Sequence, residues 1–293
     1  MVQISKAEKV AQIAMTIFLI LFGILAIFPF INAFAYALSD PIEVSKGVTI
    51  YPRKPTLINF QVIFARPDIL PAFGISILRT IIGIGYHMVI CAFASYALSM
   101  DTLPFNRLIT VFAIIPMYIS AGIVPTYVTI HQLGLINSFW VYIIPHAFGA
   151  YNMLVMRTYF KSIPESMRES ALMDGVPETR IFLQIIAPLS APVLAVIALW
   201  QGVWQWNAWF DAMLYVPNVK LHPLAMLLRR VITENEVVET GLAIDASGHG
   251  SIVFSPQSLR MAMLIITTLP IVFVYPFLQR YFVKGVMIGA IKG

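Results

Sequence analysis

The sequence has few charged residues. Asp, Glu, Lys and Arg together make up 11% of the chain, whereas 59% is hydrophobic. An average soluble domain has about 25% charged and about 45–50% apolar residues, because it needs a polar exterior. This composition therefore excludes an ordinary soluble domain. Each crossing of a bilayer takes roughly 20 apolar residues in a helix, so we expect residues 1–293 to form one membrane domain without a separate soluble domain.

The sequence also has little of what catalysis or metal binding requires. Cys91 is the only cysteine, which excludes an internal disulfide and a CxxC metal site. We expect it to pack as a small hydrophobic residue. The five histidines form no H-E-x-x-H motif, and there is no G-x-x-x-x-G-K-[ST] phosphate loop. We therefore expect a chain with no catalytic residue, metal site or cofactor of its own.

Six long apolar segments predict the architecture. They are too long for strands, and they are continuous rather than alternating as in a membrane barrel. Lipid admits only helices or closed barrels. The sequence therefore predicts an all-α polytopic membrane protein with six transmembrane helices, at about Val10–Leu38, Ala72–Ser99, Leu108–Ile130, Phe139–Met156, Pro188–Val216 and Met261–Phe282.

The distribution of positive charge indicates the orientation. An even number of spans places both termini on one side, and that side carries ten of the 19 Lys and Arg residues in loops that are shorter in total. The positive-inside rule mildly favours cytoplasmic termini. The net charge of +5 fits this role, and we expect no nucleic-acid partner. The first apolar run is about twice as long as a signal-peptide core, so we expect it to remain as a helix.

Two loops on the opposite side are long enough to contact a partner, since loops above about 12–15 residues usually have a function. They are Asp40–Pro71 and Val216–Arg260. The second loop contains an acidic patch at Glu234, Glu236 and Glu239, and a turn at Gly248-His249-Gly250.

The connection between the fourth and fifth predicted helices, about residues 157–188, is expected to contain a short charged helix. Ser162 and Glu165 are spaced as a capping box. Pro164 suits a first helical turn. Gly175 can adopt the left-handed conformation that ends a helix, and Pro177 prevents its continuation. Such a stiff helix could transmit force from a soluble partner to the membrane helices.

The alternative for this segment is an amphipathic helix that lies on the bilayer. Its charges argue against that alternative. Acidic residues stand beside Arg168 and give a balanced charge, which does not suit an anionic membrane surface; they are Glu165, Glu169 and Asp174.

The same segment contains a spaced motif. Glu169-Ser170-Ala171 is followed by three residues, Gly175, nine residues, Ile185 and then Pro188. This pattern resembles the EAA loop of ABC importer permeases, which reads Glu-Ala-Ala-x3-Gly-x9-Ile-x-Leu-Pro. The sequence departs mildly from it, with Ser170 for Ala and Ala187 for Leu. The resemblance implies that the helix docks in a groove of an ATP-hydrolysing subunit, with coupling residues Glu165, Glu169, Ala171, Asp174, Gly175, Ile185 and Pro188.

The resemblance extends over nearly the whole chain. Residues 206–211 (Trp-Asn-Ala-Trp-Phe-Asp) and 279–289 are similar to the carbohydrate-uptake branch of these permeases. More narrowly, they resemble the maltose-permease-G and LplC types, a group that includes the second permease of an alginate oligosaccharide importer.

The resemblance also implies a set of partners. They are a homologous permease in a heterodimer, two ATPase subunits that bind ATP and Mg, an extracytoplasmic solute-binding protein and membrane lipid. The implied substrate is an oligosaccharide, and the possible substrates include acidic ones such as alginate. The expected location is the bacterial inner membrane.

Two other functional classes predict different sequence features. An ion-gradient-driven secondary transporter should show an inverted repeat and ionisable residues at mid-membrane. The sequence shows no repeat, and Asp211 is the one credible buried acid. A membrane enzyme would need a convergent catalytic set, which the sequence lacks.

Four residues are candidates for the substrate path: Arg79, Trp206, Asn207 and Asp211. Charged residues inside a membrane are costly and usually face a cavity or a partner. Asn207 and Asp211 are one helical turn apart, so they are expected to share a face. The alternatives are that tryptophans form an interfacial belt and that Asp211 only pairs with a neighbouring residue.

Overall fold

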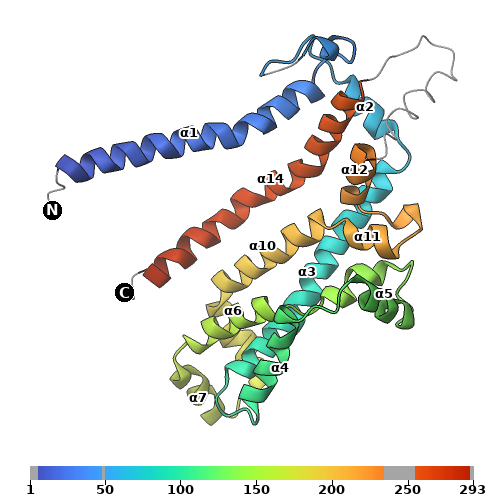
Figure 1. Ribbon diagram of the computed structural model, residues 1–293. Helices are drawn as coiled ribbons and strands as arrows, with labels where there is room; N and C mark the ends of the chain where they lie inside the picture. Colours follow the sequence, from blue (N-terminus) through green and yellow to red (C-terminus); the bar gives the residue numbers. More distant parts are fainter. Residues whose placement is uncertain (1–5, 48–49, 234–254, 291–293) are drawn as a thin grey trace. The chain divides into compact units, whose positions relative to one another are not determined.

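The structure is a computed structural model that describes residues 6–47, 50–233 and 255–290 (Figure 1). Every regular element in these ranges is a helix, and none of them is a strand. The predicted all-α fold is therefore confirmed. Contacts divide the chain into two compact units, one formed by residues 1–69 and 228–269 and the other by residues 70–227 and 270–293.

The first unit contains α1 (Lys6–Ala37), η1 (Glu43–Lys46) and α2 (Ile58–Ala65), with the first part of α14 (Pro256–Ala290). The most apolar 18-residue stretch of α1 has none of its residues buried inside the structure, whereas Ala33, Ala35 and Ala37 near the end of the helix are buried. A helix that is hydrophobic on all sides and not packed in a protein core is typical of a membrane span. Asn59 fixes the end of α1, because its side-chain amide donates to the carbonyl oxygens of Ala37 and Ser39, both at 2.9 Å.

The loop after α1 is held by ion pairs. Glu43 accepts from Lys46 at 2.6 Å and from Lys54 at 2.8 Å. These two ammonium groups lower the pKa of the Glu43 carboxyl to about 2. The acidic patch and Gly-rich turn predicted for the later loop, at residues 234–254, lie outside the described residues.

The second unit is arranged around α3 (Ile69–Ser99). The elements that follow α3 in this unit are short, and several of them are interrupted. They are α4 (Asn106–Tyr118), α5 (Ile123–Gln132), η2 (Phe139–Tyr142), η3 (Ile144–His146), α6 (Ala150–Lys161), α7 (Glu165–Met173), α8 (Glu178–Ile181), η4 (Phe182–Ile186), α9 (Ala187–Leu189), α10 (Ala191–Asn207), α11 (Phe210–Tyr215) and η5 (Val219–Leu221). The next helix, α12 (Leu224–Thr233), begins in this unit, and its residues from 228 onward belong to the first.

One face of α3 is a buried stripe of polar and small residues. The intervals are three or four residues, which places the side chains on one helix face. Large apolar side chains such as Ile81 and Val89 are exposed elsewhere on the helix. Membrane helices commonly pack through small and polar residues, because lipid is as apolar as leucine. We call this set the α3 stripe; its members are Ser76, Arg79, Gly83, His87, Cys91 and Ser95.

The predicted six continuous helices are only partly observed. Among the residues that the structure describes, three helices, α1, α3 and α14, are individually long and apolar enough to cross a membrane. The other predicted segments correspond to helix pairs bent by 118° (α4 and α5), 48° (η2–η3 and α6) and 84° (Glu178–Leu189 and α10). Up to six spans result if each bent pair counts as one.

Turn-forming residues lie at these breaks. Gly122 has a φ of +82° between α4 and α5, a conformation that favours glycine. Gly149 precedes α6, and a proline occupies the first turn of α10. The predicted continuous helix Pro188–Val216 was therefore wrong. Hydrophobicity persists across each break, so apolar length alone does not locate it.

The α3 stripe leads to a stability prediction. A methyl group at Gly83 would lie 2.7 Å from Cδ of Gln205, whose amide is held by hydrogen bonds to Arg79 and to the Tyr142 carbonyl oxygen. Gly83→Ala should therefore destabilise the protein by about 1–3 kcal/mol through overpacking. The melting temperature of the purified protein in detergent measures this effect.

Gly85→Ala is the matched control, because nothing lies within 4 Å of its added methyl group. It should leave the melting temperature unchanged or slightly higher, since alanine favours helix. Equal melting temperatures for the two variants would show that α3 does not pack closely at Gly83.

Candidate functional site

The first candidate site is the predicted coupling segment, which forms α7 and α8 on the end of α6. Gly175 has a φ of +74°, as expected for a helix-ending glycine. Its N–H donates to the Leu172 carbonyl oxygen at 3.0 Å, and the Val176 N–H donates to that of Ala171 at 3.0 Å. This pair of bonds is a Schellman motif. The predicted end of the helix is therefore confirmed.

The predicted capping box was wrong. Pro164 occupies the N-cap position of α7, so Glu165 is the first helical residue rather than the third. Ser162 instead ends α6, where its hydroxyl donates to the Tyr159 carbonyl oxygen at 2.7 Å. The intervening Pro164 has the extended conformation of an N-cap, which separates Ser162 from the N–H groups of α7.

A carboxylate ties α7 to the membrane helices. Arg168 of α7 donates through Nε to Glu178 at 3.0 Å and also pairs with it through Nη2. The hydroxyl of Tyr96, near the end of α3, donates to the other oxygen of Glu178 at 2.6 Å. One side chain therefore connects α7, α8 and α3. Sequence reasoning missed this tie, because Tyr96 lies 82 residues from Glu178.

Apolar packing anchors the same segment. Ala171 is the buried residue of α7, and it joins a core cluster with Phe160 and Phe182. Phe182 also lies 5.0 Å from the Tyr96 ring, between centroids. A larger side chain at the Ala171 position would push α7 away from this cluster, which explains the small residue in the motif. Ile185 packs against the cluster from η4, a π-helical turn.

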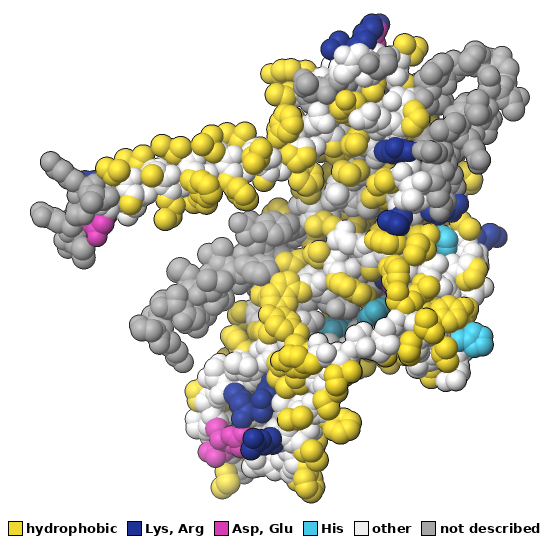
Figure 2. Space-filling model, viewed as in Figure 1, with side chains coloured by type: hydrophobic (Ala, Val, Ile, Leu, Met, Phe, Trp, Pro, Cys, Tyr) yellow, Lys and Arg dark blue, Asp and Glu magenta, His cyan; other side chains and the backbone are white. Residues whose placement is uncertain are grey.

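The outer side of α7 is acidic and apolar. Met173 is 88% exposed and Met167 is 41% exposed. In Figure 2, charged side chains of both signs gather at the end of the molecule that carries α7. The buried Ala171 and the half-buried Ile185 fix the segment, whereas the other predicted coupling residues are exposed: Glu165, Glu169, Asp174, Gly175 and Pro188.

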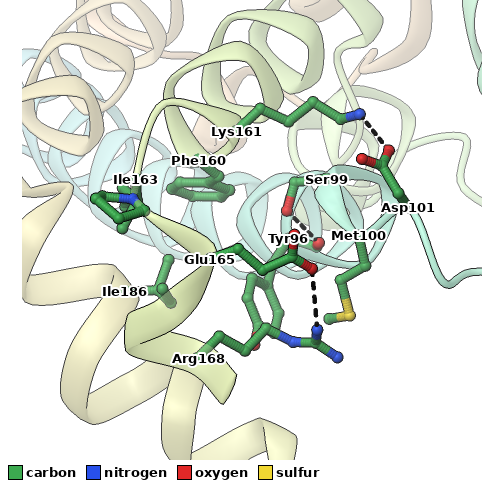
Figure 3. A pocket seen from close by; sticks show the side chains of 11 residues that line it. Tyr96, Ser99, Met100, Asp101, Phe160, Lys161, Ile163, Glu165, Arg168 and Ile186 are labelled. Carbon is green, nitrogen blue, oxygen red and sulfur yellow. Dashed lines mark hydrogen bonds and ion pairs between the residues drawn. The ribbon is translucent and has the colours of Figure 1, made fainter. Parts of the chain in front are cut away.

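A pocket of about 120 Å³ opens at the first turn of α7. Figure 3 shows Tyr96 and Phe160 lining it, with Arg168 beside Glu165. At its edge, Lys161 of α6 pairs with Asp101 at 2.6 Å and lowers the pKa of that carboxyl. The pocket is therefore a depression lined by both charged and apolar side chains.

The second candidate site surrounds Arg79, whose side chain is fully buried. Its guanidinium pairs with Asp211, with Nη2–Oδ2 at 2.6 Å and Nη1–Oδ1 at 3.3 Å. It also donates to Gln205 Oε1 through Nε and Nη2, both at 3.1 Å, and to the Ala208 carbonyl oxygen at 3.0 Å. These bonds use all five N–H donors of an arginine. The Tyr142 ring covers the guanidinium at 4.4 Å.

The four predicted path residues are in different environments. Arg79, Asp211 and Trp206 are buried, and Trp206 packs edge-on against Phe73 at 5.8 Å. Asn207 is exposed, and its amide donates to the Val203 carbonyl oxygen at 2.8 Å. The expectation that Asn207 and Asp211 share a helix face was wrong, because α10 ends at Asn207 and α11 begins at Phe210.

The α3 stripe also holds the break before α6. His87 Nδ1 lies 3.0 Å from the His146 carbonyl oxygen, which assigns the ring proton to Nδ1. His87 Nε2 then accepts from the Asn152 amide at 2.9 Å. Cys91 is buried, as expected, and its sulfur accepts from the Gly149 N–H at 3.3 Å. The regular spacing of the α3 stripe could have revealed this role from the sequence.

In the part of the chain that the structure describes, no three His, Cys, Asp or Glu side chains are grouped so as to hold a metal ion. The contacts observed in the two candidate sites are ion pairs, hydrogen bonds and aromatic contacts.

The tie between α7 and α3 leads to a second prediction. Tyr96→Phe keeps the ring in its aromatic cluster but removes a hydrogen bond to a carboxylate, which typically contributes about 1.5–3 kcal/mol. Hydrogen exchange of the α7 amides should accelerate, because Glu178, which holds Arg168 of α7, loses its hydrogen bond to α3. Exchange detected by mass spectrometry measures this.

Tyr159→Phe is the matched control, since the Tyr159 hydroxyl makes only a 3.5 Å contact with the Leu189 carbonyl oxygen and is exposed. It should leave α7 exchange unchanged. If both variants behave alike, the Glu178 tie does not hold α7.

Comparison with known proteins identifies relatives along nearly the whole length. The chain is 33% identical over 278 residues to the polygalacturonan/rhamnogalacturonan transport system permease protein YtcP of Bacillus subtilis, covering 94% of this chain and 96% of that protein. It is 32% identical over 290 residues to protein LplC of the same organism, covering 99% and 97%. No protein-family model matches the chain.

The fold is similar to solved ABC transporters. A chain of a bacterial ABC transporter involved in the import of the acidic polysaccharide alginate superposes with a TM-score of 0.88 at 26% identity, over 95% of this chain and 98% of that one. A bacterial alginate ABC transporter in complex with an alginate pentasaccharide-bound periplasmic protein shares the fold, with a TM-score of 0.61 at 14% identity and 93% coverage of each chain.

These similarities agree with the motif on α7 and with the apolar helices. The predicted resemblance is therefore confirmed, and it sets aside the ion-driven transporter. The chain belongs to the family of membrane permease subunits of carbohydrate ABC transporters.

Proposed function

We propose that this chain is a permease subunit of an ATP-driven importer of oligosaccharides, and that α7 is the helix through which separate ATPase subunits drive it. The observation that carries the proposal is α7 itself, a capped helix with an exposed acidic and apolar side and a part-buried tie to α3. A simple connector would not require this construction. The chain itself would hydrolyse nothing and would bind no cofactor, whereas the ATPase subunits would bind ATP and Mg.

The proposed assembly follows the family. A homologous permease would form a heterodimer with this chain, and two ATPase subunits would bind at the cytoplasmic face of the inner membrane. Both termini, together with α7, would lie on that face. The relatives are named as transport-system permeases, and the alginate transporter is described with a periplasmic protein that carries the sugar. These names support delivery of substrate by a solute-binding protein.

The proposed transport cycle is alternating access. ATP binding would close the ATPase dimer and move α7, and the tie through Glu178 would carry that movement to α3. The cavity between the two permeases would then change from outward-open to inward-open. ATP can shift this equilibrium only through its different affinity for the two states. The residues expected to face the ATPase are Glu165, Glu169 and Asp174, because they are exposed.

We further propose that the substrate is an acidic oligosaccharide. The relative with 33% identity is named for polygalacturonan and rhamnogalacturonan, and the structure with a TM-score of 0.88 belongs to an importer of alginate. Both groups of polysaccharide contain uronic acids.

The test uses the complex of this chain with its partner permease, ATPase and binding protein, reconstituted in liposomes. ATP hydrolysis should rise when the binding protein carries oligogalacturonate or oligoalginate. Glu169→Lys should lower this stimulated activity by on the order of tenfold, which corresponds to about 1.4 kcal/mol. The reason is that a reversed charge on the exposed side of α7 opposes a complementary docking surface.

Glu8→Lys is the matched control, because it makes the same charge change at the start of α1, outside the coupling segment. It should leave stimulation intact. Normal stimulation of ATP hydrolysis in the Glu169→Lys complex would contradict the proposal that α7 is the coupling helix. Stimulation by neutral oligosaccharides alone would contradict the acidic substrate and leave the coupling role unaffected.

A further inference from the structure

Arg79 connects the two sides of a broken membrane helix. We propose that Arg79 is a positioning residue for transport: its guanidinium fixes the bend between α10 and α11, and it does not act as a cation for an acidic sugar. The proposal rests on the proposed function for its link to transport. The geometry of the bend stands independently of that function.

The break exposes backbone groups in a segment predicted to lie in the membrane. Ala208 has an extended conformation, with φ −72° and ψ 122°, and ends the helix. Carbonyl groups at the end of a helix have no partner within it, and lipid offers no donor. Arg79 Nη1 donates to the Ala208 carbonyl oxygen at 3.0 Å. A side chain from α3 therefore replaces the backbone donor that the break removes.

The same guanidinium binds a residue on each side of the break. Gln205 lies in the last turn of α10, and Asp211 lies in the first turn of α11. Gln205 is itself oriented, because its Nε2 donates to the Tyr142 carbonyl oxygen at 3.1 Å. Asp211 Oδ1 accepts from the Ala212 N–H at 2.8 Å, which fixes the carboxylate in α11. The angle between the two helices is thus set by one planar group with five donors.

The same arrangement makes the positive charge of Arg79 inaccessible to a substrate. The carboxylate of Asp211 neutralises Arg79, and the exposed fraction of the arginine side chain is 0%. An acidic sugar would have to displace Asp211, Gln205 and the Ala208 carbonyl oxygen to reach it. Asn207 and Phe210, the residues at the two edges of the break, are exposed. Their relative position depends on the bend that Arg79 holds.

Lysine cannot reproduce this geometry. It has three donors on a single nitrogen, whereas arginine presents five donors in a rigid plane. Arg79→Lys therefore keeps the charge opposite Asp211 but cannot bridge Gln205, Ala208 and Asp211 together. The double variant Arg79→Gln, Asp211→Asn removes both charges, so it leaves no unpaired charge in the interior.

The first measurement is hydrogen exchange of the purified full-length protein in lipid nanodiscs. Peptides covering residues 205–213 should exchange at least tenfold faster in both Arg79 variants, while α6 peptides stay unchanged. Arg107→Gln, which removes an exposed arginine, is the matched control and should match the unmodified protein. Unchanged exchange at 205–213 in both Arg79 variants would overturn the proposal. If Arg79→Lys accelerates exchange throughout the chain, exchange at residues 205–213 in the double variant alone tests the proposal.

The second measurement is uptake by the reconstituted complex. The Arg79 variants should lower the maximal rate by on the order of tenfold, with the half-saturating sugar concentration within about twofold of normal. An unchanged maximal rate with a half-saturating concentration at least tenfold higher would assign Arg79 to substrate binding and overturn the proposal. Absence of uptake by the unmodified complex would contradict the proposed function, and the exchange experiment would still test the bend.

Discussion

The absence of water in the membrane is the constraint on which this structure depends. Every polar group that leaves helical geometry there needs a partner within the protein. Breaks in the helices create that need, and α3 meets it at two of them, the bend before α6 and the break between α10 and α11. Arg79 serves the end of α10, and His87 with Cys91 serves the backbone before α6. The buried face of α3 consequently carries the polar α3 stripe, whereas large apolar side chains such as Ile81 and Val89 are exposed.

The same helix reaches the coupling segment. Tyr96, one residue after the last member of the α3 stripe, binds Glu178, which also holds Arg168 of α7. About 26 Å of helix separates Arg79 from Tyr96, at 1.5 Å per residue. A displacement of α7 would therefore act on a continuous helix whose other turns are bonded to the breaks. This continuity gives a physical route between the proposed ATPase contact and the bend at Ala208.

The sequence predicted the features that depend on local chemistry. Apolar length located the membrane segments, and Gly175 marked the end of α7 because few other residues adopt its conformation. The capping box failed because Pro164 took the position assigned to Ser162. The break at Ala208 was missed because Trp206, Trp209 and Phe210 beside it are as apolar as the residues of a continuous membrane helix. Partners such as Tyr96 and Glu178, or Arg79 and Asp211, lie 82 and 132 residues apart, beyond the reach of local spacing.

Cross-linking from the exposed tip of α7 tests the central claim most directly. Met173 is 88% exposed, and Cys91 is buried, so a cysteine introduced at Met173 reacts selectively. In membranes that contain the whole transporter, Met173→Cys should cross-link to an ATPase subunit through a short bismaleimide. Tyr51→Cys, in the loop after α1 and 81% exposed, should not. A cross-link from Tyr51→Cys but not from Met173→Cys would contradict the proposed orientation and the coupling role of α7.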